Sequence, residues 1–204
     1  MKCAGRMALV VATSLLVLGL ATLQASAQAP AGVPVVKVTP ENSSIKFSVK
    51  ASVALEGTFD KWDATLTFTS PDVTTGVLDV EIQAASVNTG SGMKDGKLKG
   101  KDFFDVEHDP LITFKSTKIV QTGPNTFEVD GDFTMRGVTK TDTLTLTGTG
   151  QGTGSGEIKG TMAFDRKDYG MNSGIPFIKI ANRVEVTVDL KLKRTSGPPL
   201  VFKE

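Results

Sequence analysis

The chain has 204 residues, a single cysteine and a formal net charge of +1 at neutral pH. Its length suits one domain with a substantial apolar core. The balanced charge excludes a protein that binds nucleic acid through a strongly basic surface. With Cys3 alone, the chain has neither an internal disulfide nor a cysteine-rich metal site.

The first 27 residues have the order of a secretory signal peptide. Lys2 and Arg6 precede an apolar stretch over residues 7–23, and the small-residue run Ala-Ser-Ala follows at 25–27. We expect cleavage after Ala27, which leaves a mature chain without cysteine and with a net charge of −1. The alternative is a retained N-terminal anchor, for which an apolar stretch of about 17 residues is at the short limit.

Residues 28–41 are rich in proline and alanine, and we expect a flexible lead-in there, with a short strand at Val35–Val38 as the alternative. From residue 42 onward, apolar and polar residues alternate, which is typical of half-buried strands. Turn sequences rich in glycine, proline, asparagine and aspartate separate the alternating segments. These segments are residues 45–49, 57–68, 78–82, 112–114, 127–135, 144–146, 158–164 and 184–192.

Residues 84–108 interrupt the alternation. A connection of about 25 residues inside a compact domain is usually functional or contains a short helix. Residues 93–99 are the candidate for such a helix, although Gly96 disfavours it. Residues 195–204 follow the last strand and are expected to form a C-terminal tail.

The sequence has about eight predicted strands, and no segment shows the apolar periodicity of an amphipathic helix. This pattern predicts an all-β fold. Antiparallel strands of this number form a sandwich, a jelly roll or a closed barrel, and alternation alone does not separate these. Closure has the advantage that it removes exposed sheet edges. A membrane barrel is disfavoured, because one tryptophan and one tyrosine do not supply two aromatic girdles. We therefore expect a water-soluble sheet with its apolar face inward and no stable membrane insertion.

Three blocks of sequence carry a family resemblance. The first comprises residues 85–89 (ASVNT), 101–106 (KDFFDV) and 108–117 (HDPLITFKST). The second is 129–140 (VDGDFTMRGVTK), and the third is 164–172 (FDRKDYGMN) together with 184–190. In these blocks the chain resembles the YceI-like family of exported, lipocalin-like barrels that bind polyisoprenoid lipids.

This resemblance implies a lipocalin-like barrel of about eight antiparallel strands over residues 42–194, located in the periplasm. The chain departs from the family pattern at three positions. Lys94 and Lys97 stand where family members often carry an arginine and a histidine, and Ala51 stands where a histidine often ends the first strand.

The apolar face of such a barrel supplies the candidate ligand site. An eight-stranded barrel has an interior that is either filled by its own side chains or able to hold one ligand. From the residues alone, an ordinary packed core is the alternative, and the family resemblance favours a lipid site. The candidate lining residues are Phe47, Phe59, Phe68, Ile112, Phe114, Phe127, Phe133, Met135, Met162, Phe164 and Val186.

Two groups of polar residues are candidates for a head-group site at the barrel mouth. Lys94, Lys97 and Lys99 lie on the long connection and suit a phosphate head group, or else form a solvated loop. Arg166 and Tyr169 follow a strand and either line the mouth or belong to an ordinary turn. The apolar, proline-containing stretch 175–180 is expected to form a flap or lip.

The sequence contains no recognisable catalytic constellation. His108 is the only histidine, and neither a nucleophile pair nor a set of metal ligands accompanies it. We therefore expect no catalytic residue, no metal and no cofactor.

The resulting hypothesis is an exported, non-enzymatic protein that sequesters or transports an amphiphilic isoprenoid-type lipid. The alternative is a structural or stress-response barrel with a self-filled core that acts through its surface. The oligomeric state is left open, with a homodimer as one outcome.

Overall fold

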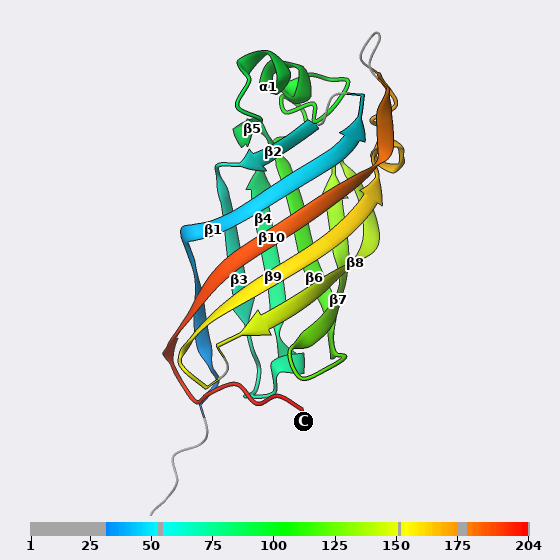
Figure 1. Ribbon diagram of the computed structural model, residues 1–204. Helices are drawn as coiled ribbons and strands as arrows, with labels where there is room; N and C mark the ends of the chain where they lie inside the picture. The colour runs from blue at the N-terminus through cyan, green and yellow to red at the C-terminus, as the bar shows by residue number, and fades with distance from the viewer. Residues whose placement is uncertain (1–31, 53–54, 151, 175–178, 204) are drawn as a thin grey trace, which may run out of the picture.

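The structure is a computed structural model that describes residues 32–52, 55–150, 152–174 and 179–203 (Figure 1). The predicted signal peptide, residues 1–27, lies outside the described residues, as does most of the predicted flap. No helix in the described part of the chain is long and apolar enough to cross a membrane. The strands are β1 (Val35–Ala51), β2 (Leu55–Phe59), β3 (Trp62–Thr67), β4 (Val77–Gln83), β5 (Val87–Asn88), β6 (Leu111–Gln121), β7 (Thr126–Met135), β8 (Val138–Thr149), β9 (Ser155–Asp165) and β10 (Ile180–Ser196). The helical elements are α1 (Gly92–Lys99) and the 3₁₀ turns η1 (Val73–Thr75), η2 (Ala84–Ser86) and η3 (Arg166–Tyr169).

Eight antiparallel strands close into a barrel (Figure 1). Neighbouring strands follow the order β10-β9-β8-β7-β6-β4-β3-β1, and β1 pairs with β10 to complete the circle. β1 is long enough to have two neighbours on its other side, β3 near its start and β2 near its end. The predicted all-β, lipocalin-like barrel of about eight strands is confirmed.

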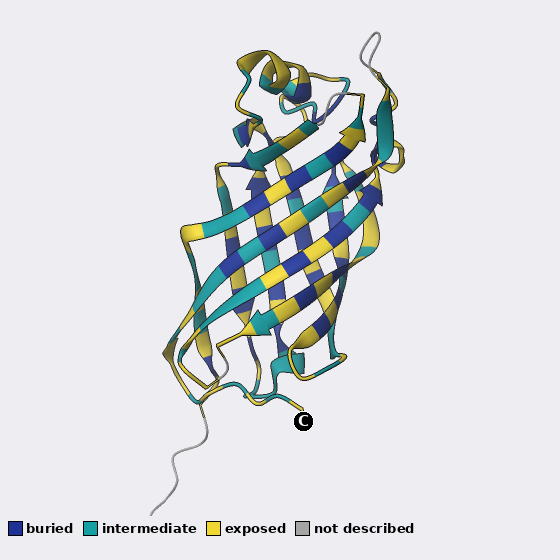
Figure 2. Cartoon of the chain, in the orientation of Figure 1, coloured by how far each residue is buried: buried dark blue, intermediate teal, exposed yellow. Residues whose placement is uncertain are grey.

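The alternation of the sequence determines which residues face inward, as the striped strands of Figure 2 show. On β7, the buried residues are Phe127, Val129, Gly131, Phe133 and Met135, whereas the residues between them are exposed or half-buried. Gly131 leaves room for a neighbour, because a Cβ atom there would lie 2.6 Å from the ring of Phe114. A glycine on the apolar face thus lets a large aromatic ring enter the interior.

Helix α1 and the loop after it cover one end of the barrel, which we call the α1 end (Figure 1). The helix occupies residues 92–99, close to the predicted 93–99. Asp95 fixes its first turn by accepting hydrogen bonds from the backbone N–H and the hydroxyl of Thr89, at 2.8 and 2.7 Å. Leu98, Phe103 and Phe104 are buried beneath this cover.

Residues 198–203 cross the opposite end of the barrel (Figure 1). We call this segment the C-terminal strap and this end the strap end. Val201 forms a parallel bridge with Asp72, so the described part of the predicted tail 195–204 is packed against the barrel. The predicted lead-in 28–41 is also shorter than expected, because β1 begins at Val35 and β10 continues to Ser196. The chain thus has regular structure on both sides of the predicted limits 42–194.

The middle of the barrel is filled by side chains that we call the central belt. Each of the eight barrel strands contributes at least one of them. Phe133 is the best connected aromatic residue of the belt, with its ring 5.2 Å from that of Phe164 and 5.4 Å from that of Tyr169. The belt consists of Ile45, Ala64, Val80, Phe114, Phe133, Leu144, Met162, Val188 and Leu190.

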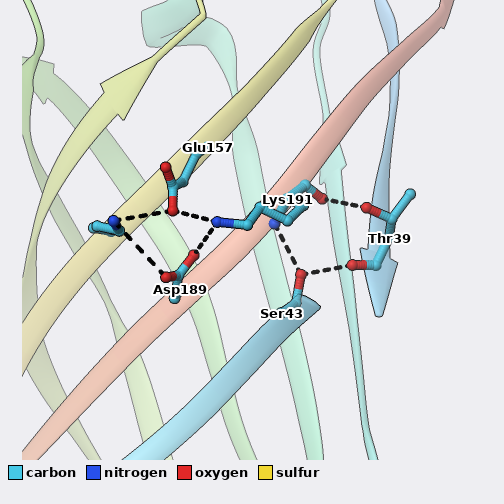
Figure 3. A network of polar contacts seen from close by, with 6 residues as sticks. Thr39, Ser43, Glu157, Asp189 and Lys191 are labelled. Atoms are coloured by element: carbon cyan, nitrogen blue, oxygen red, sulfur yellow. Dashed lines mark hydrogen bonds and ion pairs between the residues drawn. The ribbon is translucent and has the colours of Figure 1, made fainter. Parts of the chain in front are cut away.

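A wide bulge in β1 is held from the outer surface of the barrel. Thr39 pairs with Lys191 and Ser44 with Asp189, so residues 40–43 of β1 lie opposite Leu190 alone. The Ser43 hydroxyl accepts from the Lys191 backbone N–H at 2.8 Å and donates to the Thr39 carbonyl at 2.6 Å (Figure 3). The Thr39 hydroxyl also donates to the Lys191 carbonyl at 3.1 Å, so two hydroxyl groups connect β1 and β10 at the bulge.

The side chain of Lys191 joins an ionic network beside this bulge (Figure 3). Its ammonium group contacts the carboxylates of Glu157 and Asp189, and Lys159 lies 3.1 Å from Glu157. Hydrogen bonds from Lys191 and Lys159 lower the pKa of the Glu157 carboxyl to about 2. The network thus favours the ionised form of Glu157 in the folded protein.

Phe133→Ala should destabilise the fold, because it removes a ring from the packed belt and leaves a cavity. We expect a loss of about 3–5 kcal/mol in the free energy of unfolding, measured by urea denaturation. Glu128→Ala, on the exposed face of the same strand, serves as control and should change stability by less than about 0.5 kcal/mol. Equal stabilities of the two variants would contradict a packed belt.

The Glu157 network should make stability depend on pH in the acidic range. Because the pKa of Glu157 falls from an ordinary 4.5 to about 2 on folding, its contribution is complete above pH 4.5 and is lost as the pH falls through 2. We expect the stability difference between the natural protein and Glu157→Gln to shrink over this range in urea titrations. Glu128→Gln removes a carboxylate without an ion-pair partner among the described residues, and it should leave the pH profile unchanged.

Candidate ligand site

A cavity of about 130 Å³ lies inside the strap end of the barrel. An engineered apolar protein cavity of about 150 Å³ binds benzene or xenon, so this space suits an apolar group of similar size. Its wall is formed by apolar side chains and by the backbone of the glycine-rich β8–β9 connection. The apolar lining residues are Val36, Leu66, Phe68, Val73, Leu78, Ile119, Phe127, Val129, Leu146, Ile158, Leu192, Pro199, Leu200 and Phe202.

Five glycines in the described part of the β8–β9 region contribute only backbone to this wall. Gly148, Gly150, Gly152, Gly154 and Gly156 all line the cavity. Gly150 has a φ of +81°, and a Cβ atom there would lie 2.2 Å from a backbone oxygen. This hairpin therefore requires glycine, and its thin wall leaves open the space that larger side chains would fill.

A second cavity of about 50 Å³ lies beneath the cover of the α1 end. It shares no lining residue with the first, and the central belt lies between the two sets of lining residues. Three phenylalanine rings, Phe47, Phe59 and Phe104, contact one another along its wall at centroid distances of 5.6–6.3 Å. The interior is therefore divided into two separate apolar spaces.

The predicted lining residues are distributed over both cavities and the belt. Phe68 and Phe127 line the strap-end cavity. Phe114, Phe133 and Met162 belong to the belt and line neither cavity. The remaining six, Phe47, Phe59, Ile112, Met135, Phe164 and Val186, line the cavity at the α1 end. The structure thus places all of them inside the barrel but does not bring them into one space, and their contact with a ligand stays a prediction.

The predicted head-group lysines lie on α1. Lys94 and Lys97 are exposed, and Lys99 is half-buried. The Lys97 ammonium lies 2.7 Å from the Asp102 carboxylate and 5.8 Å from the centre of the Phe103 ring. This ion pair lowers the pKa of Asp102. Lys97 therefore already has partners in the loop that follows its helix.

Arg166 and Tyr169 are both buried, Arg166 lines the cavity at the α1 end, and the contact of either residue with a head group stays a prediction. The Arg166 guanidinium donates to the backbone carbonyls of Ala181, Met171 and Ser173. The Tyr169 hydroxyl donates to Asp142 at 2.9 Å, and burial together with this carboxylate raises the pKa of Tyr169. Both residues organise the turn η3 and the chain after it.

Sequence reasoning missed Arg194 and the C-terminal strap, both of which line the strap-end cavity. The alternation over residues 184–192 could have identified Arg194, because continuing it by one step places position 194 on the inward face. The strap had no such signal, since its prolines and short length indicated only a tail.

His108 is exposed, and its Nδ1 lies 3.0 Å from the Asp105 carboxylate, which raises the pKa of His108. In the part of the chain that the structure describes, no group of three or more His, Cys, Asp or Glu side chains is arranged to hold a metal ion. The two apolar cavities are the candidate functional site.

Curated bacterial proteins are similar to this chain in sequence. A UPF0312 protein of Pseudomonas savastanoi pv. phaseolicola is 35% identical over 127 residues, which are 61% of this chain and 66% of that protein. Protein YceI of Escherichia coli O17:K52:H18 is 36% identical over 90 residues, or 44% of this chain and 47% of that protein. The matches thus span between 45% and 66% of the length of these curated relatives.

Solved structures share the barrel. BcnA of Burkholderia cenocepacia superposes with a TM-score of 0.69 at 26% identity, covering 76% of this chain and 99% of that one. A polyisoprenoid binding domain from Saccharophagus degradans has a TM-score of 0.64 at 15% identity, covering 79% and 99%, and shows the same fold. The YceI-like domain matches residues 37–192, which are most of the sequence. The chain therefore belongs to the YceI-like family.

Proposed function

We propose that the protein binds an amphiphilic isoprenoid-type lipid inside its barrel and acts as a carrier rather than as an enzyme. The observation that supports this most directly is the strap-end cavity, which is about 130 Å³ in volume and lined chiefly by apolar side chains. The fold shared with the polyisoprenoid binding domain from Saccharophagus degradans adds support. An isoprenoid chain is the part of such a lipid that an apolar cavity would hold.

The binding energy of this site comes from removing apolar surface from water. Each buried CH₂ group contributes about 0.8 kcal/mol, so no specific polar contact is needed to hold a chain. The cavity has room for a group about the size of benzene. A long polyisoprenoid therefore also needs a movement of the strap or of belt side chains.

The packed belt favours a second candidate function, a structural barrel that acts through its surface. The two functions differ in what the purified protein contains. We expect solvent extraction and mass spectrometry of protein purified without detergent to yield an isoprenoid-type lipid. Repeated absence of lipid, together with failure to bind added polyprenyl lipid, would favour the structural barrel.

We also propose that the protein is exported to the periplasm and loses its first 27 residues. This proposal is supported by the charged, apolar and small-residue order of those residues. The mature protein isolated from a periplasmic fraction should begin at Gln28 in N-terminal peptide mapping. Recovery of the intact N-terminus with the membrane fraction would indicate a retained anchor instead.

Leu146→Trp should block the strap-end cavity, because Leu146 is an inward residue of its wall. We expect at least a roughly tenfold loss of affinity for 1-N-phenylnaphthylamine in a fluorescence titration. This uncharged apolar dye is larger than benzene, so, like a polyisoprenoid, it needs both the cavity and a movement of the strap, and the added ring removes the cavity's share of that space. Thr145→Trp places the same side chain on the exposed face of β8 and should leave affinity unchanged. Unchanged binding in a folded Leu146→Trp protein would mean that the ligand binds elsewhere.

A further inference from the structure

The strap end is closed by a segment that does not belong to the barrel sheet. The strap is attached to η1 by two backbone hydrogen bonds, from Val201 N to the Pro71 carbonyl at 2.8 Å and from Val73 N to the Val201 carbonyl at 3.1 Å. Two more bonds join the backbone of Lys203 to the side chain of Gln121, at 2.7 and 2.8 Å. Each hydrogen bond adds little net stability, so these few contacts hold the strap far less firmly than a ladder of bonds holds a barrel strand.

The strap places apolar side chains where a ligand would enter. Leu200 and Phe202 both line the cavity, and the Phe202 ring lies 6.2 Å from that of Phe127. Val201, between them, is 59% exposed and points away from the core. The two inward side chains of the strap therefore fill the mouth of the cavity and cover its apolar wall.

Arg194 lies at the same end with its side chain on the inward face of β10. Its backbone N–H donates to the Gly154 carbonyl at 2.8 Å, and its guanidinium donates to the Gly197 carbonyl. It is the one cationic residue among the described residues that line this cavity. Glu157, the acidic residue of the lining, has its carboxylate paired with Lys191 and Lys159.

A guanidinium group beside an apolar cavity is suited to an amphiphile with an anionic head group. Arginine donates several hydrogen bonds in a planar fork that fits phosphate and carboxylate oxygens. No carboxylate of the described residues forms an ion pair with Arg194. The charge of Arg194 is thus available to a ligand at the rim.

The α1 end is a poorer entrance to this cavity. Arg136 holds its covering loop by donating to the carbonyls of Lys101 and Phe103. The buried guanidinium of Arg166 is bonded to three carbonyls of the chain itself. A ligand that entered there would also have to pass the central belt, because the two cavities share no lining residue.

We propose that an anionic amphiphile enters the barrel through the strap end by displacing residues 198–203, and that Arg194 binds its head group. This inference rests on the proposed function and specifies the entrance, the gate and the charge of the ligand. The apolar chain replaces Leu200 and Phe202 against the cavity wall, and the phosphate or carboxylate replaces the Gly197 carbonyl at the guanidinium.

A reversible lock of the strap tests the gate. Asp72 and Val201 are bridge partners, so Asp72→Cys with Val201→Cys, in a Cys3→Ser background, places two thiols at the separation usual for a disulfide. We expect the oxidised protein to take up 1-N-phenylnaphthylamine at least about tenfold more slowly than the reduced protein in stopped-flow fluorescence. The reduced form carries the same substitutions and is therefore the matched control.

A shortened chain that ends at Gly197 tests the same gate without new cysteines. It should bind the dye faster than the full chain, because the occupant of the cavity mouth is gone. Equal rates in the oxidised, reduced and shortened proteins would overturn the gate while leaving the lipid site intact. Absence of dye binding in all three would overturn the proposed function and the gate together.

Head-group recognition is tested by competition against the bound dye. Arg194→Gln should weaken farnesyl phosphate by about tenfold or more and leave farnesol unchanged, since only the phosphate loses a charged hydrogen bond. Competition by palmitate, compared with that by farnesyl phosphate, shows whether the site prefers a carboxylate or a phosphate. Lys193→Gln, on the exposed outer face of the same strand, should change none of these affinities. Equal losses for farnesyl phosphate and farnesol in Arg194→Gln would overturn the role of Arg194.

Discussion

The antiparallel pairing of β1 with β10 is the constraint on which the rest of the structure depends. It joins the two ends of the sheet over almost the whole of both strands, from Val35 opposite Ser196 to Ala51 opposite Ile180. Closure pairs the two terminal strands of the sheet with each other and turns the apolar face of every strand toward the inside of the barrel. The bulge at residues 40–43 interrupts this pairing, which explains why the Ser43 hydroxyl and the Lys191 network lie beside it.

Once the barrel is closed, the size of each inward residue decides whether the interior is filled or open. Phe114 and Phe133 fill the middle, and Gly131 makes room for the ring of Phe114. At the strap end the glycines of residues 148–156 leave the wall thin, and the cavity opens beside them. The same barrel therefore contains both a packed core and a candidate binding site. The packed belt fits a structural role, and the cavity at the strap end fits ligand binding.

The sequence predicted most of the fold, because alternation is a local property that directly determines which side chains face inward. It predicted the start of β1 less well, since Pro40 and the bulge after it break the period. The alternation of apolar and polar residues could not predict that the barrel closes, because closure depends on pairing between residues about 150 positions apart. The orientation of Arg166 and Tyr169 also depended on long-range contacts, with Ala181 and Asp142. The strands of the barrel were therefore predictable from the sequence, whereas the separation of the interior into two cavities was not.

The two ends of the barrel differ in how much structure must be disrupted to open them. At the α1 end, buried Leu98, Phe103 and Phe104 would have to leave the core together with α1. At the strap end, a short segment held by a few hydrogen bonds and two apolar side chains would have to lift. Local opening in proteins follows the least stable unit. When the strap leaves, its apolar side chains lose their contacts with the cavity wall. An apolar ligand forms new contacts with that wall and so compensates for the loss. The barrel can therefore exchange its ligand at the strap end while the β1–β10 closure remains intact.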